Sequence, residues 1–206
     1  RENWHYVPRV RPGLSLKEMD EPQRTLCLAL VAAGLSERGE EKARLIIEVE
    51  ELLGRIEGPD RKFKRDNELY YISIFGTPAA TGSWGWRFEG HHISLNFTAA
   101  GNDLPSVTPA FFGSNPHVVP AGPNAGQRLL GAEEELAREL MSLLDQGQLQ
   151  VTIFEDEAPR DIFTGNSREA SIGNYQGISI ASLTDEQRGA FMQLLEEYLH
   201  NARHDV

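Results

Sequence analysis

Residues 84–98 read WGWRFEGHHISLNFT, and this stretch decides the fold because two alternating segments flank a Gly-His pair. If Gly90 and His91 form a two-residue turn, the glycine supplies the backbone angles that a tight hairpin needs. Side chains of a strand alternate between the two faces of a sheet. One face then carries the apolar residues Trp84, Trp86, Phe88, Ile93, Leu95 and Phe97. The alternation is consistent on both strands, which supports this register.

The other face of the expected hairpin gathers polar side chains. This register pairs Glu89 with His92, Arg87 with Ser94, and Gly85 with Asn96. A carboxylate beside an imidazole can fix the orientation and tautomer of the ring. We therefore interpret His92 and Glu89 as candidate catalytic residues, with His92 as a general base or metal ligand.

The remaining polar residues of this face are candidates for substrate binding. Arg87 can hold a carboxylate or phosphate through two parallel hydrogen bonds. Ser94 and Asn96 offer a hydroxyl and an amide beside it, and Trp84 and Trp86 offer aromatic surfaces. Ser94 as a nucleophile has less support, because a residue in mid-strand lacks the sharp turn of a nucleophile elbow.

A divalent transition metal is a possible cofactor, with His92, His91 and Glu89 as ligands. The recognised zinc spacings HExxH and paired CxxC are absent from the sequence. The alternative interpretation is structural, with His91 serving only as a turn residue. Polar residues on the outer face of an antiparallel sheet are common, and opposite charges across strands stabilise it by roughly 0.2–1 kcal/mol.

Composition restricts the class of protein. The chain has 206 residues and a net charge of -11, which suits a single domain that repels nucleic acid. The basic cluster Arg61, Lys62, Lys64 and Arg65 is expected to be a solvated loop. No apolar run approaches the ~18–20 residues of a membrane span. The single cysteine, Cys27, lies in an apolar helical run and is expected to be buried.

The order of segments predicts an α+β fold, with a small antiparallel sheet around the central hairpin packed against N-terminal and C-terminal helices. The expected segments are an extended arm (1–18), a helical pair (19–57), the sheet core (68–98), a long loop (99–131), and a region with a helix, short strands including QLQVTIF, and a C-terminal helix (132–206). Asp20, Ser36 and Thr184 are the expected helix caps. The long loop is expected to lie over a site.

A longer pattern extends the analysis to a family. The strings ELYYISIFGTPAATGSWGWRFEGHHISLNFT, TPAFFGSNP and GQRLLGAEEELARELM resemble the family named domain of unknown function 3500. The resemblance runs through most of the chain and is densest from Glu68 to Arg138. It implies a further segment rich in histidine and aromatic residues, so the chain is interpreted as a possible fragment of a longer domain. It also implies export from the cytoplasm, and it implies no settled activity.

Three functions follow from these observations. The first is a metal-dependent enzyme of unknown substrate that uses the polar face of the 84–98 hairpin. The second is a non-catalytic module that binds a small molecule or peptide on the same face. The third is a purely structural domain in which the motif serves packing. The sequence leaves the oligomeric state open.

Overall fold

In the computed structural model, residues 4–167 and 169–204 are described, and this part of the chain divides into two compact units. The first unit comprises residues 4–130 and 200–204, and the second comprises residues 131–199. Helices and antiparallel strands occur together, so the predicted α+β class is confirmed. Among the described residues, no helix combines the length and the apolar character that crossing a membrane requires.

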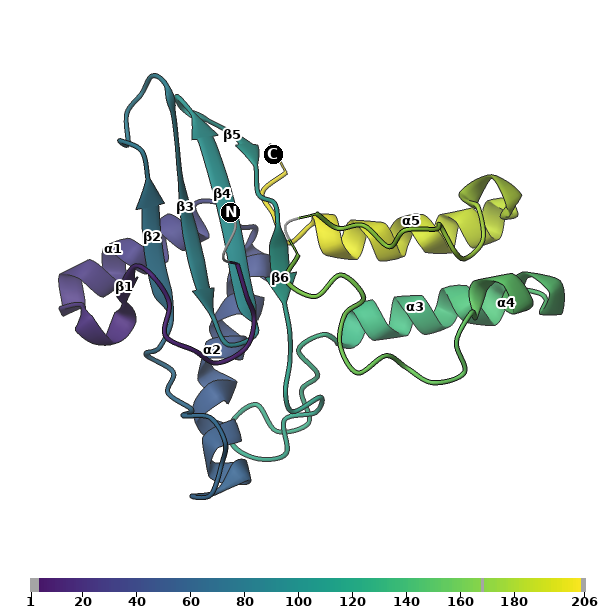
Figure 1. Ribbon diagram of the computed structural model, residues 1–206, viewed down its shortest axis with the longest axis horizontal. Coiled ribbons are helices and arrows are strands. Elements are labelled where there is room, and N and C mark those ends of the chain that lie inside the picture. The colour runs from purple at the N-terminus through teal and green to yellow at the C-terminus, as the bar shows by residue number, and fades with distance from the viewer. Residues whose placement is uncertain (1–3, 168, 205–206) are drawn as a thin grey trace. The chain divides into compact units, whose positions relative to one another are not determined.

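The first unit contains an antiparallel sheet, drawn in Figure 1. Its described strands are β1 (Leu14–Ser15), β2 (Tyr71–Phe75), β3 (Ser83–Gly90), β4 (Ile93–Ala100), β5 (Asp103–Ser106) and β6 (Ala110–Phe112). They lie in the order β1-β2-β3-β4-β5, and β6 pairs with β4. The central β3–β4 hairpin is the predicted one, and it supplies most of the buried residues of the sheet.

Two helices cover one face of the sheet. They are α1 (Glu21–Ala32) and α2 (Glu37–Glu57), and a short 3₁₀ turn, η1 (Leu16–Glu18), precedes them. Asp20 accepts a hydrogen bond from the Gln23 backbone and Ser36 accepts one from Gly39, so both predicted caps are confirmed. The apolar hairpin face packs with α1 and α2 in one core that includes Val31, Leu45, Ile46, Val49, Phe88, Ile93 and Leu95.

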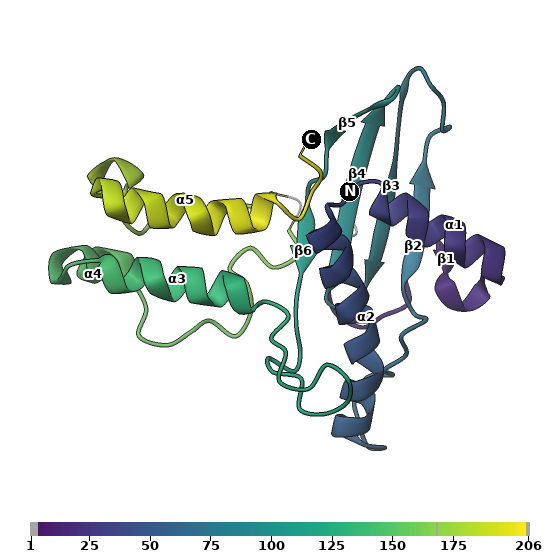
Figure 2. The ribbon, with the colours of Figure 1, turned by 180° about the vertical axis from the view of Figure 1, so that it is seen from behind.

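The opposite face of the sheet is crossed by the N-terminal arm, residues 4–13. Figure 1 shows this dark purple segment in front of the strands, and Figure 2 shows α1 and α2 in front of them after a half turn. The arm is anchored by aromatic contacts, because the Tyr6 ring stacks on the Phe111 ring with centroids 4.7 Å apart. The hairpin is therefore covered on both faces, by helices on one side and by the arm on part of the other.

The prediction of a structureless loop over residues 99–131 is wrong in its first half. The chain reverses at Gly101, whose φ of 66° favours glycine, and β5 and β6 then pair with β4. β4 would otherwise leave its outer backbone hydrogen-bonding groups unpaired, and pairing satisfies them. The sheet core thus extends beyond the predicted limits 68–98 at both ends, because β1 lies in the arm region.

The second unit contains α3 (Gly131–Leu143), α4 (Gln146–Thr152), η2 (Ile180–Ser182) and α5 (Asp185–Leu199), and α3 packs on α5. The predicted strand QLQVTIF is wrong, because residues 146–152 form helix α4. Asp145 caps this helix and Gln148 completes a capping box, which outweighs the β-branched Val151 and Thr152. The described residues of this unit contain no strand, so the other predicted short strand is also absent. The predicted capping box between Thr184 and Gln187 is confirmed.

Candidate functional site

The face of the sheet opposite α1 and α2 carries the polar hairpin residues in three cross-strand rows. The register of β2, β3 and β4 places the rows as Tyr71, Glu89 and Ser94, then Ser73, Arg87 and Asn96, then Phe75, Gly85 and Thr98. Arg87, Glu89, Ser94 and Asn96 therefore share one face and are all buried. Trp84 and Trp86 belong to the other face, where Trp86 is buried against the Phe97 ring with centroids 4.8 Å apart.

The hairpin turn lies one residue later than predicted. Gly90 pairs with Ile93, and His91 with His92 forms the turn. The predicted pairs Glu89–His92 and Arg87–Ser94 are therefore wrong, and Glu89 pairs with Ser94 while Arg87 pairs with Asn96. The assignment of residues to faces survives, because the register changes by two positions and strand side chains alternate with a period of two.

Tertiary contacts account for the position of the turn. The Tyr70 ring lies against Gly90, leaving no room for a side chain there. His92 adopts a φ of 59°, a left-handed conformation that histidine tolerates better than most residues. Its backbone N–H donates to the Tyr6 carbonyl at 2.9 Å, and its carbonyl accepts from the Gly113 N–H at 2.8 Å. These partners are distant in sequence, so the turn is fixed by the arm and by β6.

A buried ion network fills the first two rows. Arg11 from the arm lies 3.2 Å from the Glu89 carboxylate, and Arg87 lies 3.6 Å from it on the other side. Burial raises the pKa of Glu89, and the charges of Arg11 and Arg87 oppose that rise. Burial likewise lowers the pKa of Arg11 while Glu89 opposes the change. Two guanidinium groups thus share one carboxylate in a desolvated environment.

The arm closes over this network through Arg11. Its Nη2 donates to the Val7 carbonyl at 2.6 Å and to the Gly90 carbonyl at 2.9 Å. Arg11 therefore ties the arm to the end of β3 while its charge faces Glu89. The arm therefore lies at the row of Glu89 through Arg11, and at the next row Ser73 donates a hydrogen bond to the Pro12 carbonyl at 3.1 Å.

A groove lies at the third row. Its lining includes Phe75, Gly85, Arg87, Asn96 and Thr98, which share the polar face, and its volume is about 420 Å³. A Cβ atom at Gly85 would meet the backbone carbonyl oxygen of Phe97, so only the side chains of Phe75 and Thr98 extend from this row. The Arg87 guanidinium lies 5.6 Å from the centre of the Phe75 ring. This groove is where the hairpin face can accept a ligand.

The floor of the groove is organised by Arg87 and Asn96. Arg87 Nε donates to Asn96 Oδ1 at 2.7 Å, and Asn96 Nδ2 donates to the Pro109 carbonyl at 2.8 Å. Among the described residues, none forms a hydrogen bond with Arg87 Nη2, although this atom is buried. Buried donors in native proteins nearly always have a partner, so Nη2 can donate a hydrogen bond to an oxygen atom of a ligand.

The proposed metal ligands do not meet in one place. His92 and His91 lie in the turn with rings 3.8 Å apart, whereas Glu89 lies on the sheet face with Arg11. Within residues 4–167 and 169–204, no three side chains of His, Cys, Asp or Glu gather in a way that could hold a metal ion. The imidazole of His92 therefore has no carboxylate from Glu89 to orient it.

His91 has a role that the sequence did not show. Its Nδ1 lies 2.5 Å from a carboxylate oxygen of Glu50 on α2, and both side chains are buried. Arg65 lies 3.6 Å from Glu50 and forms two hydrogen bonds with Glu57, at 2.6 and 2.7 Å. Tyr70 donates its hydroxyl hydrogen to the His91 carbonyl at 3.1 Å. The turn is thus attached to α2 and to the loop before β2.

The sequence did not predict three of the residues that make these contacts. Arg11 lies in the arm, Glu50 lies on helix α2, and Arg65 belongs to the basic cluster that was expected to be a solvated loop. One signal was available in part: the helical spacing of Leu45, Ile46 and Val49 marks the buried side of α2, and Glu50 directly follows it. The sequence contains no comparable signal for Arg11 or Arg65.

A pH effect follows from the environment of His92. Burial, followed by the charges of His91 and Arg65, lowers the pKa of His92 to about 3. The unfolded chain, with a histidine pKa near 6.5, takes up this proton first as the pH falls. The folded state therefore loses stability from about pH 6.5 downward toward pH 3. Between pH 6.5 and pH 5, we expect the free energy of unfolding of the wild type to fall by about 1–2 kcal/mol more than that of His92→Asn, after allowance for solvent screening.

Urea unfolding at both pH values measures this difference. Asparagine is a suitable replacement because it also tolerates the left-handed conformation. Since Glu89 and the other titrating groups are present in both proteins, their contributions largely cancel in the comparison. If the free energies of unfolding of the two proteins fell in parallel with pH, the lowered pKa of His92 would not be the cause of the loss.

An antiparallel sheet with helices on one face and a buried ion network on the other defines an α+β domain with a groove beside its central hairpin. The family described as "Protein of unknown function (DUF3500)" matches residues 1–206, the whole chain, and the protein belongs to this family. No curated protein and no solved structure matches the chain significantly.

Proposed function

We propose that the protein is a non-catalytic module that binds a small molecule through its carboxylate, in the groove lined by Phe75, Gly85, Arg87 and Asn96. The observation that carries this proposal concerns Arg87, a residue that lines the groove and whose buried Nη2 has no hydrogen-bond partner among the described residues. An unsatisfied buried donor costs about 1–3 kcal/mol. A ligand oxygen that accepts from Nη2 would recover that cost.

The charge of this face supports an anionic ligand. Arg11 and Arg87 together share the single carboxylate of Glu89, and Arg11 is the closer of the two, at 3.2 Å against 3.6 Å. Glu89 therefore neutralises the charge of Arg87 only in part, and Arg87 can still attract another anion. Guanidinium groups match the planar geometry of a carboxylate, which favours this ligand over a spherical anion.

The shape and lining of the groove support a ligand with an apolar part. Phe75 is about half exposed, and its ring lies beside the Arg87 guanidinium. The volume of about 420 Å³ is within the range of roughly 300–1,000 Å³ that small-molecule sites occupy. A planar apolar group can lie on the ring of Phe75 while its carboxylate reaches Arg87.

A metal-dependent enzyme on the same face has less support. It requires His92 beside Glu89, and the observed register places His92 in the turn. Among the described residues, no three side chains of His, Cys, Asp or Glu lie together in a way that could hold a metal ion. Binding through Arg87 and Asn96 uses residues that the structure does place together.

We expect benzoate to bind saturably to the wild type and the Arg87→Gln variant to lose that binding. Calorimetric titration measures the affinity, and acetate in place of benzoate reports how much the apolar ring contributes. Arg55→Gln is the matched control, because Arg55 is exposed on α2 and its ion-pair partner among the described residues is the exposed Glu51. It removes the same charge and should leave the affinity within about twofold. The proposal fails if benzoate does not bind, or if both variants bind it equally.

A further inference from the structure

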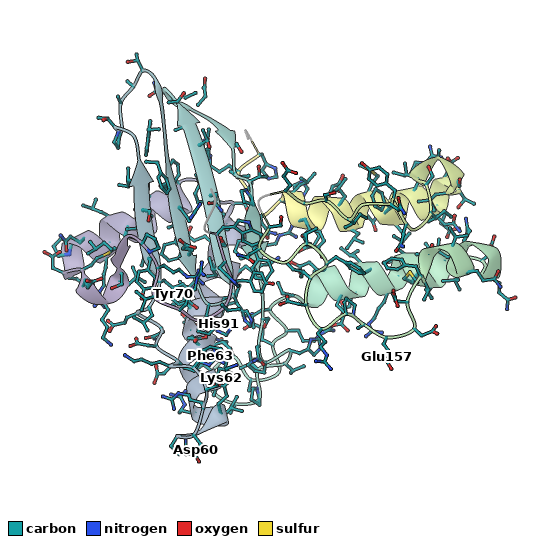
Figure 3. The ribbon with its side chains drawn as sticks, in the orientation of Figure 1. Asp60, Lys62, Phe63, Tyr70, His91 and Glu157 are labelled. Carbon is teal, nitrogen blue, oxygen red and sulfur yellow. The ribbon has the colours of Figure 1, made fainter. Side chains whose placement is uncertain are left out.

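A second cavity lies at the other end of the sheet, and the groove at Arg87 does not explain it. Its volume is about 400 Å³, and its lining comes from the arm, α2, the loop before β2, the start of β2 and the hairpin turn. Figure 3 labels Lys62, Phe63, Tyr70 and His91 of this lining beside one another. Four segments that are distant in sequence, residues 8–10, Glu50, residues 62–71 and His91, thus contribute to one cavity.

The inner wall of this cavity combines aromatic side chains with a polarised imidazole. Tyr70 and Tyr71 are buried, and Phe63 is partly exposed beside them. His91 reaches the cavity while its Nδ1 is held at 2.5 Å from Glu50. A carboxylate bonded to one ring nitrogen fixes the orientation of the ring, and Arg65 Nη1 lies 3.2 Å from the same nitrogen.

The rim of the cavity is basic, although the protein as a whole carries a net charge of -11. Arg9, Lys62 and Lys64 line it. Lys64 lies 3.1 Å from Asp66, whose carboxylate also binds Lys17 at 2.6 Å. Lys62 lies over the Phe63 ring, with Nζ 5.2 Å from its centre, and no ion pair holds it among the described residues.

The two carboxylates in the lining are already committed to other partners. Glu50 is bound by His91 and approached by Arg65 at 3.6 Å, and Asp66 is shared by Lys17 and Lys64. The neighbouring cations partly neutralise both carboxylates. Their repulsion of an anion that enters between Lys62 and His91 is therefore weakened. The basic cluster at residues 61–65 was expected to be a solvated loop, but its residues Lys62 and Lys64 line this cavity.

We propose that this cavity is a second site, and that it binds a small phosphate-bearing molecule with a ring-sized apolar part. The ammonium groups of Lys62 and Lys64 face the phosphate, as lysines do in many phosphate sites. The His91 ring, which Glu50 holds in place, lies beside the phosphate. The apolar part lies against Phe63 and Tyr71. This proposal does not rest on the groove at Arg87.

Phenyl phosphate and inorganic phosphate are the probes for this site. We expect phenyl phosphate to bind saturably and more tightly than inorganic phosphate, because only the former fills the aromatic wall. The double variant Lys62→Ala/Lys64→Ala should bind phenyl phosphate about tenfold more weakly. Arg44→Ala/Arg55→Ala is the matched control, because it also removes two exposed positive charges from the same unit, on α2.

The NMR signal of the His91 ring supplies a readout that a structural role would not change. We expect the His91 Cε1–H resonance to shift on addition of phenyl phosphate, because the ring lines the cavity. Glu50→Gln should reduce this shift, because it weakens the contact that holds the ring in place. Equal binding by both double variants would overturn the proposal, and so would a His91 signal that phenyl phosphate leaves unmoved.

The two proposed sites can fail independently. Arg87→Gln should leave phenyl phosphate binding at the His91 cavity intact, and Lys62→Ala/Lys64→Ala should leave benzoate binding at the groove intact. Loss of phenyl phosphate binding in Arg87→Gln alone would assign that ligand to the groove and overturn the second site.

Discussion

Replacing Glu89 with glutamine is expected to lower the free energy of unfolding by about 3–5 kcal/mol. Glu89 is 1% exposed and is the shared partner of Arg11 and Arg87. The substitution keeps the size of the side chain but leaves two desolvated guanidinium groups facing a neutral amide. Urea unfolding of the wild type and the variant at neutral pH measures the loss.

The control for this prediction is an ion pair on the surface. Glu51→Gln removes a carboxylate that pairs with Arg55 on the exposed side of α2, and such pairs contribute about 0.3–0.5 kcal/mol. Combining Glu89→Gln with Arg11→Met should cost less than the sum of the two single changes, because each removes a charge that the other leaves unpaired. A loss in Glu89→Gln no larger than that in Glu51→Gln would show that the buried network contributes little to stability.

Replacing Gly90 with alanine is expected to lower the free energy of unfolding by about 3 kcal/mol, at the upper end of the usual cost of overpacking. A methyl group at this position would meet the edge of the Tyr70 ring, whose Cε1 would lie 2.6 Å away. The ring cannot move aside easily, because Tyr70 is 1% exposed, stacks on Phe88 and binds the His91 carbonyl. Thermal unfolding followed by circular dichroism measures the loss.

Two further variants test the cause of this effect. Gly90→Ala combined with Tyr70→Leu should show a loss smaller than the sum of the single losses, because the added methyl group then has space. Gly189→Ala, in α5, meets no atom within 4 Å and should instead stabilise its helix by up to about 1 kcal/mol. If Gly90→Ala were as stable as the wild type, the turn would not depend on the contact with Tyr70.

Both predictions concern positions at which local patterns favoured a different arrangement. The pattern Glu-Gly-His-His favoured a turn at Gly90 because glycine suits a tight turn. In the structure Gly90 remains in the strand, and the reason is the aromatic ring packed against it. The same displacement removes His92 from the polar face and separates it from Glu89, so the predicted catalytic pair does not form.

The polar face itself was predictable because strand side chains alternate between the two faces with a period of two. A register that is shifted by two positions therefore leaves every side chain on the same face. Arg87, Glu89, Ser94 and Asn96 therefore lie together whether the turn falls at Gly90 or one residue later. The function of that face was less predictable. Whether its residues are open to a ligand depends on Arg11 and the arm, and no spacing in the sequence links residue 11 to residue 89.

The sequence by itself determined the elements with strong local signals. These are the α+β class, the central hairpin with its two faces, the helix caps at Asp20, Ser36 and Thr184, and the family. Each depends on residues only a few positions apart, or on a long string of residues, so the chain carries the information locally. Helix α4 was not predicted although its capping box at Asp145 is equally local, because the β-branched residues Val151 and Thr152 favour a strand.

Only the tertiary structure decided the turn, the closure of the arm over Glu89 and the cavity beside His91. These features join Arg11 to Glu89, Glu50 to His91, and Tyr70 to Gly90. The residues of each pair are at least 20 positions apart, and their side chains give no periodic signal. Their positions follow from the packing of a whole sheet between α2 and the arm, because burial decides which charges need partners and which glycine has room for a side chain.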